Sequence, residues 1–150
     1  MSVTLKERLK VAKNEKQKKI IIKDICDEIL ICDSDVSFVD VSYNDLLSPL
    51  CGHDVQSIGF EVDDKLLFDR FVCFLNEKRV SGDAYFYISK EDSYHVIKVN
   101  ISYFISNPAF FWRLKGGNNG KSDCILVSVN GTFGFCKLYT EYNYELVEWG

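Results

Sequence analysis

The spacing of apolar residues changes from a helical period to a period of two at Gly82, and this change most constrains the fold. Before Gly82, apolar side chains recur on one helical face over residues 64–79, and Asp63 or Asp64 is placed to cap that helix. After Gly82, residues 83–89 and 94–105 alternate apolar and polar side chains, which is typical of strands. The order of these segments predicts an α+β fold, in which helices pack on a sheet.

Further strands are predicted near the C-terminus. Asn130-Gly131 separates two apolar stretches, residues 123–129 and 132–140, and this dipeptide is a strong signal for a β-hairpin. Residues 142–149 have the pattern of a last strand, and residues 36–41 and 55–62 are either short strands or irregular. We therefore expect an antiparallel sheet of four to six strands in the C-terminal half.

The N-terminal residues have the pattern of a helix that packs on this sheet. Thr4 and Glu7 have the spacing of a capping box, and isoleucines recur at helical spacing over residues 20–30. The intervening residues 13–19 are polar on all sides, which favours a break or an exposed turn there. At 150 residues the chain has the length of one domain, residues 1–150, with its own core.

Charge is divided unevenly along the chain. Residues 1–23 contain eight basic and two acidic residues, whereas residues 24–64 contain eleven acidic residues and neither Lys nor Arg. The remainder after residue 23 has a net charge of −10, which would repel nucleic acid and anionic membranes. We therefore expect neither as a partner, and we expect the basic N-terminal residues to dock on the acidic body or to be solvated.

The sequence also bears on compartment. No apolar run approaches the roughly 20 residues that a membrane helix needs, and the N-terminus lacks the apolar region of a secretory signal. We expect a cytoplasmic protein whose six cysteines are reduced, with Cys26, Cys73, Cys124 and Cys136 inside apolar stretches as core thiols.

A search for catalytic or metal-binding motifs favours no chemistry. The stretch KGGNNGKS at residues 115–122 resembles a phosphate loop, but the first required Gly is Lys115 and a strand follows, so a flexible hairpin connection is preferred. Cys51 and His53 are too close in sequence to form a good catalytic pair or half of a zinc site. His95 is expected to be a core histidine on an apolar strand face. We expect no metal and no cofactor, and enzymatic activity is undecided but disfavoured.

The remaining features indicate a protein-binding surface. Asp24, Asp27 and Glu28 fall near the N-terminal cations and are expected to be neutralised internally. The three consecutive aromatic residues 110–112 are expected to contribute one exposed ring, Trp112, from a long loop as a binding anchor. The acidic residues expected to meet a basic partner are Asp33, Asp35, Asp40, Asp45, Asp54 and Glu61.

This profile is similar to that of bacterial immunity proteins, which neutralise toxins that are often basic nucleases. The leading hypothesis is therefore a small acidic binding or inhibitor protein whose partner is a basic toxin or effector. Two alternatives remain open: a secretion chaperone for an effector protein, and a small-molecule-binding or enzymatic α+β domain with a cavity near His95, Tyr103 and Phe71. The oligomeric state is not indicated.

Overall fold

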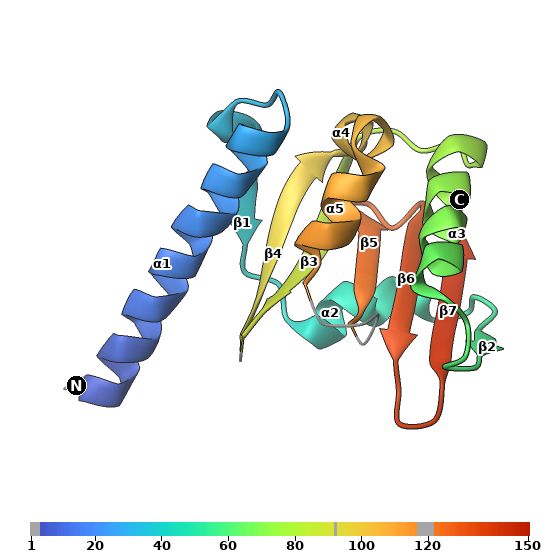
Figure 1. Ribbon diagram of the computed structural model, residues 1–150, viewed down its shortest axis with the longest axis horizontal. Coiled ribbons are helices and arrows are strands. Elements are labelled where there is room, and N and C mark those ends of the chain that lie inside the picture. The colour runs from blue at the N-terminus through green and yellow to red at the C-terminus, as the bar shows by residue number, and fades with distance from the viewer. Residues whose placement is uncertain (1–3, 92, 117–121) are drawn as a thin grey trace.

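A computed structural model describes residues 4–91, 93–116 and 122–150. Its described helices and strands form an α+β fold with a seven-stranded antiparallel sheet, which confirms the fold class (Figure 1). The helices are α1 (Leu5–Glu28), α2 (Tyr43–Leu47), α3 (Asp64–Glu77), α4 (Ile101–Ser106) and α5 (Pro108–Leu114), with short 3-10 turns η1 (Asp33–Asp35) and η2 (Ser48–Leu50). The strands are β1 (Ser37–Val39), β2 (Gln56–Ile58), β3 (Asp83–Lys90), β4 (Ser93–Asn100), β5 (Cys124–Ser128), β6 (Gly134–Tyr139) and β7 (Tyr144–Trp149).

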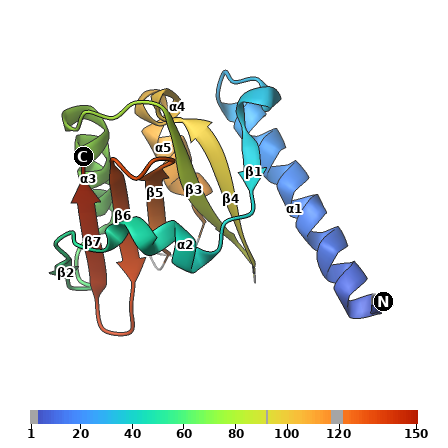
Figure 2. The same cartoon turned by 180° about the vertical axis from the view of Figure 1, so that it is seen from behind.

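The sheet order is β1-β4-β3-β5-β6-β7-β2, so the two short strands from the N-terminal half occupy opposite edges. Ser37 of β1 pairs with Lys98 of β4, and Ser57 of β2 pairs with Glu145 of β7. The chain between β1 and β2 must therefore cross the whole sheet, and Figure 2 shows α2 lying across the back face on this path. Six interstrand spacings of about 4.8 Å make the crossing on the order of 30 Å long.

Helices cover the front face of the sheet more extensively than the back face. Ile21 and Ile25 of α1, and Ile29 just after it, pack with α3, α4 and α5 against the front of the sheet, in the larger of two apolar clusters. The smaller cluster lies on the back face, where Leu46 of α2 packs against strand residues such as Ile125 and Val147. Successive side chains of a strand point to opposite faces of the sheet, and apolar residues at both sets of positions give the sheet two apolar faces.

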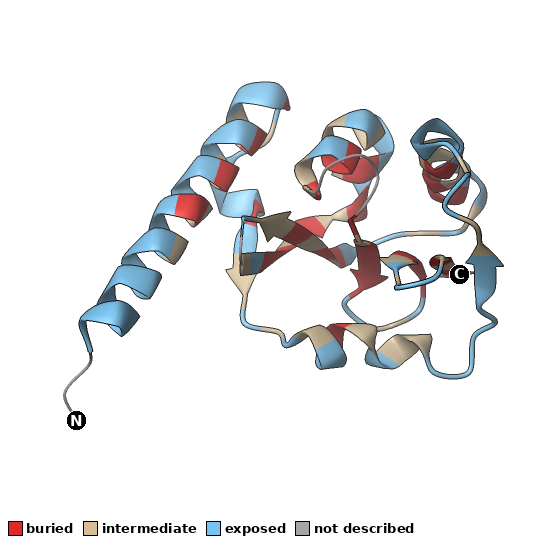
Figure 3. Cartoon of the chain, turned by 60° about the horizontal axis from the view of Figure 1, so that its bottom comes forward, coloured by how far each residue is buried: buried red, intermediate tan, exposed pale blue. Residues whose placement is uncertain are grey.

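α1 is a single helix, and the break expected at residues 13–19 is wrong. The predicted capping box is present, because the Thr4 hydroxyl accepts the Glu7 amide and the Glu7 carboxylate accepts the Thr4 amide. Residues 13–19 contain no Gly or Pro, and Lys, Glu and Gln are good helix formers, so the helix continues through them. Its first half projects beyond the sheet and is exposed all round (Figure 3).

The predicted strand over residues 94–105 is too long. β4 ends at Asn100, whose side-chain oxygen accepts the Ser102 amide at 3.0 Å and caps α4. Pro108 then begins α5, which contains the three aromatic residues that we expected on a long loop. Two short helices form in place of the loop because Asn100 and Pro108 are residues that begin helices. The alternation of apolar and polar residues in this stretch had favoured a strand instead.

The C-terminal hairpins agree with the sequence. β5 pairs with β6 and β6 with β7, as expected from Asn130-Gly131 and from the last apolar stretch. The turn between β5 and β6 spans residues 129–133, and Gly131 adopts a φ of 75°, a conformation that favours glycine. The helix at 64–79 is also confirmed as α3, with Asp63 as its N-cap.

Two expectations about the remaining chain can be compared with the structure. Cys124 and Cys136 are buried thiols as expected, but Cys73 is exposed and Cys26 only partly buried, because each faces away from the sheet on its helix. Among the described residues, no helix is both long enough and apolar enough to cross a membrane.

Candidate functional site

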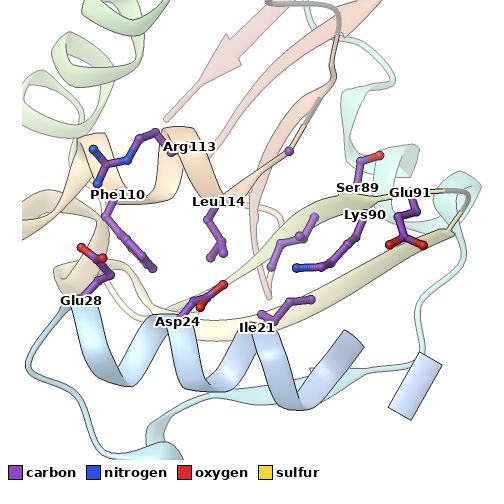
Figure 4. Close-up of a pocket in the computed structure, with 11 residues that line it drawn as sticks. Ile21, Asp24, Glu28, Ser89, Lys90, Glu91, Phe110, Arg113 and Leu114 are labelled. Carbon is purple, nitrogen blue, oxygen red and sulfur yellow. The ribbon is translucent and has the colours of Figure 1, made fainter. Parts of the chain in front are cut away.

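A groove lies between α1 and α5, and the last residues of β3 form part of its floor (Figure 4). Its volume is about 520 Å³. The floor is apolar, and Asp24 and Glu28, one helical turn apart on α1, form one wall in Figure 4. The remaining lining residues of chemical interest are Ile21, Ile88, Lys90, Phe110, Arg113 and Leu114.

The groove bears on one expectation about charge. Asp24 and Glu28 were expected to be neutralised by the N-terminal cations, yet no ion pair in the described part of the chain includes either of them. The two cations of α1 with described ion pairs contact Glu91 and Glu15 instead. Its lining combines apolar side chains with carboxylates and with the cationic side chains of Lys90 and Arg113.

The six acidic residues expected to meet a partner are all exposed, and no described ion pair includes any of them. They fall into two groups. Asp33 and Asp35 lie on η1, where the Asp35 carboxylate accepts the Tyr103 hydroxyl at 3.1 Å. The other four follow the path that crosses the back face, and we call them the acidic band: Asp40, Asp45, Asp54 and Glu61.

The sheet topology holds the acidic band in place. Asp40 follows the edge strand β1, Asp45 lies on α2, and Glu61 follows the opposite edge strand β2. α2 is fixed by the Tyr43 hydroxyl, which donates to the carboxylate of Asp123, just before β5, at 2.8 Å. Burial raises the pKa of Tyr43, and the hydrogen bond to Asp123 raises it further, so this tyrosine stays protonated as the donor.

The expectation that Trp112 is an exposed anchor is wrong. Only 6% of this residue is exposed, and its ring packs against Phe68 and Phe71 in the front core. Its indole N–H donates to the Asp64 carboxylate at 3.1 Å, and the Lys115 ammonium lies 4.3 Å from the ring centre. Trp112 turns inward because α5 is a helix, which places residues 111 and 112 toward the sheet.

His95 is a buried histidine, as expected, and its partner is a glutamine. Its Nε2 lies 2.8 Å from the Gln17 side-chain oxygen, and the same oxygen accepts the Ser93 hydroxyl at 2.6 Å. His95 also lines a hollow of about 390 Å³. Among the described residues, neither Tyr103 nor Phe71 lines it, so the three residues do not share this hollow.

The environment of His95 predicts a pH-dependent stability. Burial lowers the pKa of His95, and nearby Lys18 and Lys90 lower it further. Because the neutral ring is favoured in the folded state, the unfolded state binds the extra proton first. We expect the free energy of unfolding to fall as the pH is lowered through about 6.5 and to level off below the folded pKa. Chemical denaturation between pH 8 and pH 5 is the measurement.

The control for this pH effect is His95→Asn. This variant should lose stability at pH 8 but show a flatter dependence of stability on pH over the same interval. An unchanged pH dependence in the variant would assign the effect to other groups.

The other sequence candidates do not assemble into a reactive site. Cys51 and His53 are both exposed, and the His53 ring stacks on Trp149 with 4.6 Å between centres. No cluster of three or more potential metal ligands occurs among the residues that the structure describes. The glycine-rich stretch falls largely on residues 117–121, which lie outside the described residues, and β5 follows it as a strand.

One surface feature was missed by the sequence reasoning. Phe60, Tyr139 and Tyr142 are large and exposed, and they lie after β2 and at the β6–β7 hairpin. The sequence of residues 139–145 could have indicated these exposed rings, because three tyrosines there are interspersed with polar and acidic residues around a turn.

Comparison with known proteins identifies a family but no function. The family model described as YxiF protein matches residues 65–149, which is more than half of the chain, so the chain belongs to this family. The match begins on α3 and ends on β7, and thus leaves out α1 and the whole acidic band. No curated protein and no solved structure matches the chain.

Proposed function

We propose that this member of the YxiF family is a small acidic inhibitor protein, of the kind that acts as a bacterial immunity protein, and that it binds a basic toxin through its acidic band. The observation that supports this proposal is that all four carboxylates of the band are exposed and outside every described ion pair. An intramolecular role in stability would pair them with cations, whereas residues 40–61 contain neither Lys nor Arg.

The size of the band fits a protein partner. A standard protein interface buries about 800 Å² on each side, which corresponds to a patch about 28 Å across. The crossing from β1 to β2 has this length, because it spans six interstrand spacings of about 4.8 Å. A line of exposed carboxylates on this scale raises the rate of association with a basic surface and disfavours acidic partners.

The test is co-expression with the product of the neighbouring reading frame. We expect that product alone to arrest growth, and we expect co-expression of this chain to restore growth through a complex that co-purifies and weakens at high salt. A neighbour whose toxicity persists on co-expression, with no complex at low salt, would contradict the proposed function.

The groove between α1 and α5 favours a second candidate, a secretion chaperone for an effector protein. Its apolar floor suits an extended or helical segment, and Asp24 and Glu28 suit a basic residue next to that segment. The same co-expression separates the two candidates: a chaperone would raise the amount of soluble neighbour without relieving any toxicity. Asp24→Lys with Glu28→Lys would abolish that gain, whereas the inhibitor function would be unaffected.

A further inference from the structure

Two exposed aromatic rings, Phe60 and Tyr139, are stacked at one end of the acidic band, and a third exposed ring, Tyr142, lies in the adjacent hairpin turn. The Phe60 ring stacks on Tyr139 with 5.2 Å between centres and meets the Tyr144 ring edge-on at 5.1 Å. Phe60 and Tyr139 are each 41% exposed, and Tyr142, at the turn of the same hairpin as Tyr139, is 81% exposed. We call Phe60, Tyr139 and Tyr142 the aromatic patch.

Hydrogen bonds hold the hairpin that carries two of these rings. The Thr140 hydroxyl accepts the Asn143 amide at 3.1 Å and donates to the Asn143 carbonyl at 2.7 Å, which closes the turn on both sides of Tyr142. The Tyr139 amide donates to the Asp123 carboxylate at 2.8 Å. Because the backbone is already fixed, binding a partner here orders little more than side chains.

The surroundings of the aromatic patch are acidic. Residues 60–64 and 139–145 contain five acidic residues and neither Lys nor Arg. Glu61 belongs to the acidic band and follows Phe60, while Glu141 precedes Tyr142, and both are exposed. Within the described residues, neither Glu61 nor Glu141 takes part in an ion pair.

We infer that the aromatic patch is the anchor of the acidic band and that the partner presents arginine side chains to it. This inference rests on the proposed function and names the chemistry of the partner. A guanidinium group is planar, so it stacks on an aromatic face while it donates to a neighbouring carboxylate. A lysine ammonium is a more strongly hydrated point charge and gains less from the rings, so aromatic rings beside carboxylates select arginine over lysine.

The probes for this inference are tetra-arginine and tetra-lysine peptides, which carry equal charge. Their affinities for the full chain are measured at low ionic strength by calorimetry, and the ring signals of Tyr139 and Tyr142 are followed by NMR. We expect the arginine peptide to bind about fivefold more tightly, from exposed cation–π contacts, and to shift the two tyrosine signals.

Two variants separate ring chemistry from apolar area. Phe60→Leu with Tyr142→Leu keeps apolar side chains but removes two rings, and we expect it to bind both peptides equally. Tyr94→Leu is the matched control, because Tyr94 is 42% exposed and lies outside the patch, so this variant should keep the preference for arginine. Tyr142→Leu alone, at the most exposed of the three rings, keeps the test valid if the double variant unfolds.

The outcomes distinguish this inference from the function on which it rests. The anchor would be overturned if the wild type bound both peptides with equal affinity, or if the preference for arginine survived in Tyr142→Leu and in the double variant. Either result would leave the proposed role of the acidic band unaffected. Failure of both peptides to bind at low ionic strength would overturn the anchor and the acidic-band proposal together.

Discussion

Reversal of the four charges of the acidic band to Lys is expected to slow association with the basic partner by about 100-fold at low ionic strength. The variant contains Asp40→Lys, Asp45→Lys, Asp54→Lys and Glu61→Lys. All four side chains are exposed, so the change acts on the electrostatic potential of the surface and leaves the core intact. Electrostatic steering accelerates association by 10- to 1000-fold, and reversal turns this attraction into repulsion. Stopped-flow measurement of the association rate against salt concentration is the test.

The matched control changes net charge by the same amount elsewhere. Asp27, Asp69, Glu77 and Asp83 are exposed acidic residues outside the band, and their reversal to Lys changes the net charge equally. If association depends only on net charge, the two variants will be equally slow. We expect the control to keep most of the wild-type rate, because local potential at the interface governs docking. Equal slowing by both variants would contradict a band-specific role.

Trp112→Ala is expected to lower the free energy of unfolding by about 3–5 kcal/mol, the range for removing a large aromatic side chain from a core. The ring contacts Phe68 and Phe71, and its N–H donates to Asp64, so truncation leaves a cavity and an unmatched carboxylate beside it. Trp112→Phe should cost less, because most of the ring contacts remain. Urea denaturation followed by circular dichroism is the measurement.

The Trp112 series also separates a core role from a surface role. Tyr142→Ala removes an exposed aromatic side chain and should change the unfolding free energy by no more than about 0.5 kcal/mol. Trp112→Phe should keep the affinity for the partner, since the indole does not face solvent. If Trp112→Ala were as stable as the wild type but lost affinity for the partner, Trp112 would instead be a binding anchor.

The family match covers only part of the molecule. It covers α3 to α5 and strands β3 to β7, which are the five central strands of the sheet, whereas α1, α2 and both edge strands, β1 and β2, lie outside it. The acidic band up to Glu61 and the groove wall of Asp24 and Glu28 therefore belong to the part of this chain beyond the family match. In the proposed function, the matched region supplies the scaffold and the N-terminal part supplies much of the contact surface.

Local signals in the sequence were sufficient for most elements but not for the switch at Asn100. The alternation of Ile97, Val99 and Ile101 continues into residues that form a helix. Residues 101, 103 and 105 keep strand spacing, while residues 101 and 104 have helical spacing, so the segment fits both patterns. The polar residues 13–19 were misjudged for the opposite reason. A helix with no apolar stripe there has no periodic signal, and it persists because Thr4 caps its N-terminal end and its C-terminal half packs against the sheet.

The sequence by itself determined the α+β class, the cap at Thr4, a helix start at Asp63 or Asp64, the hairpin at Asn130-Gly131 and the exposure of the acidic side chains, because each depends on residues close in the chain. Only the tertiary structure decided where those carboxylates lie. The pairing of β1 with β4 and of β2 with β7 joins residues far apart in sequence, and it stretches the acidic band across the sheet. The same long-range packing buried Trp112 and brought Phe60 onto Tyr139, since contacts between distant segments leave no periodic trace in the chain.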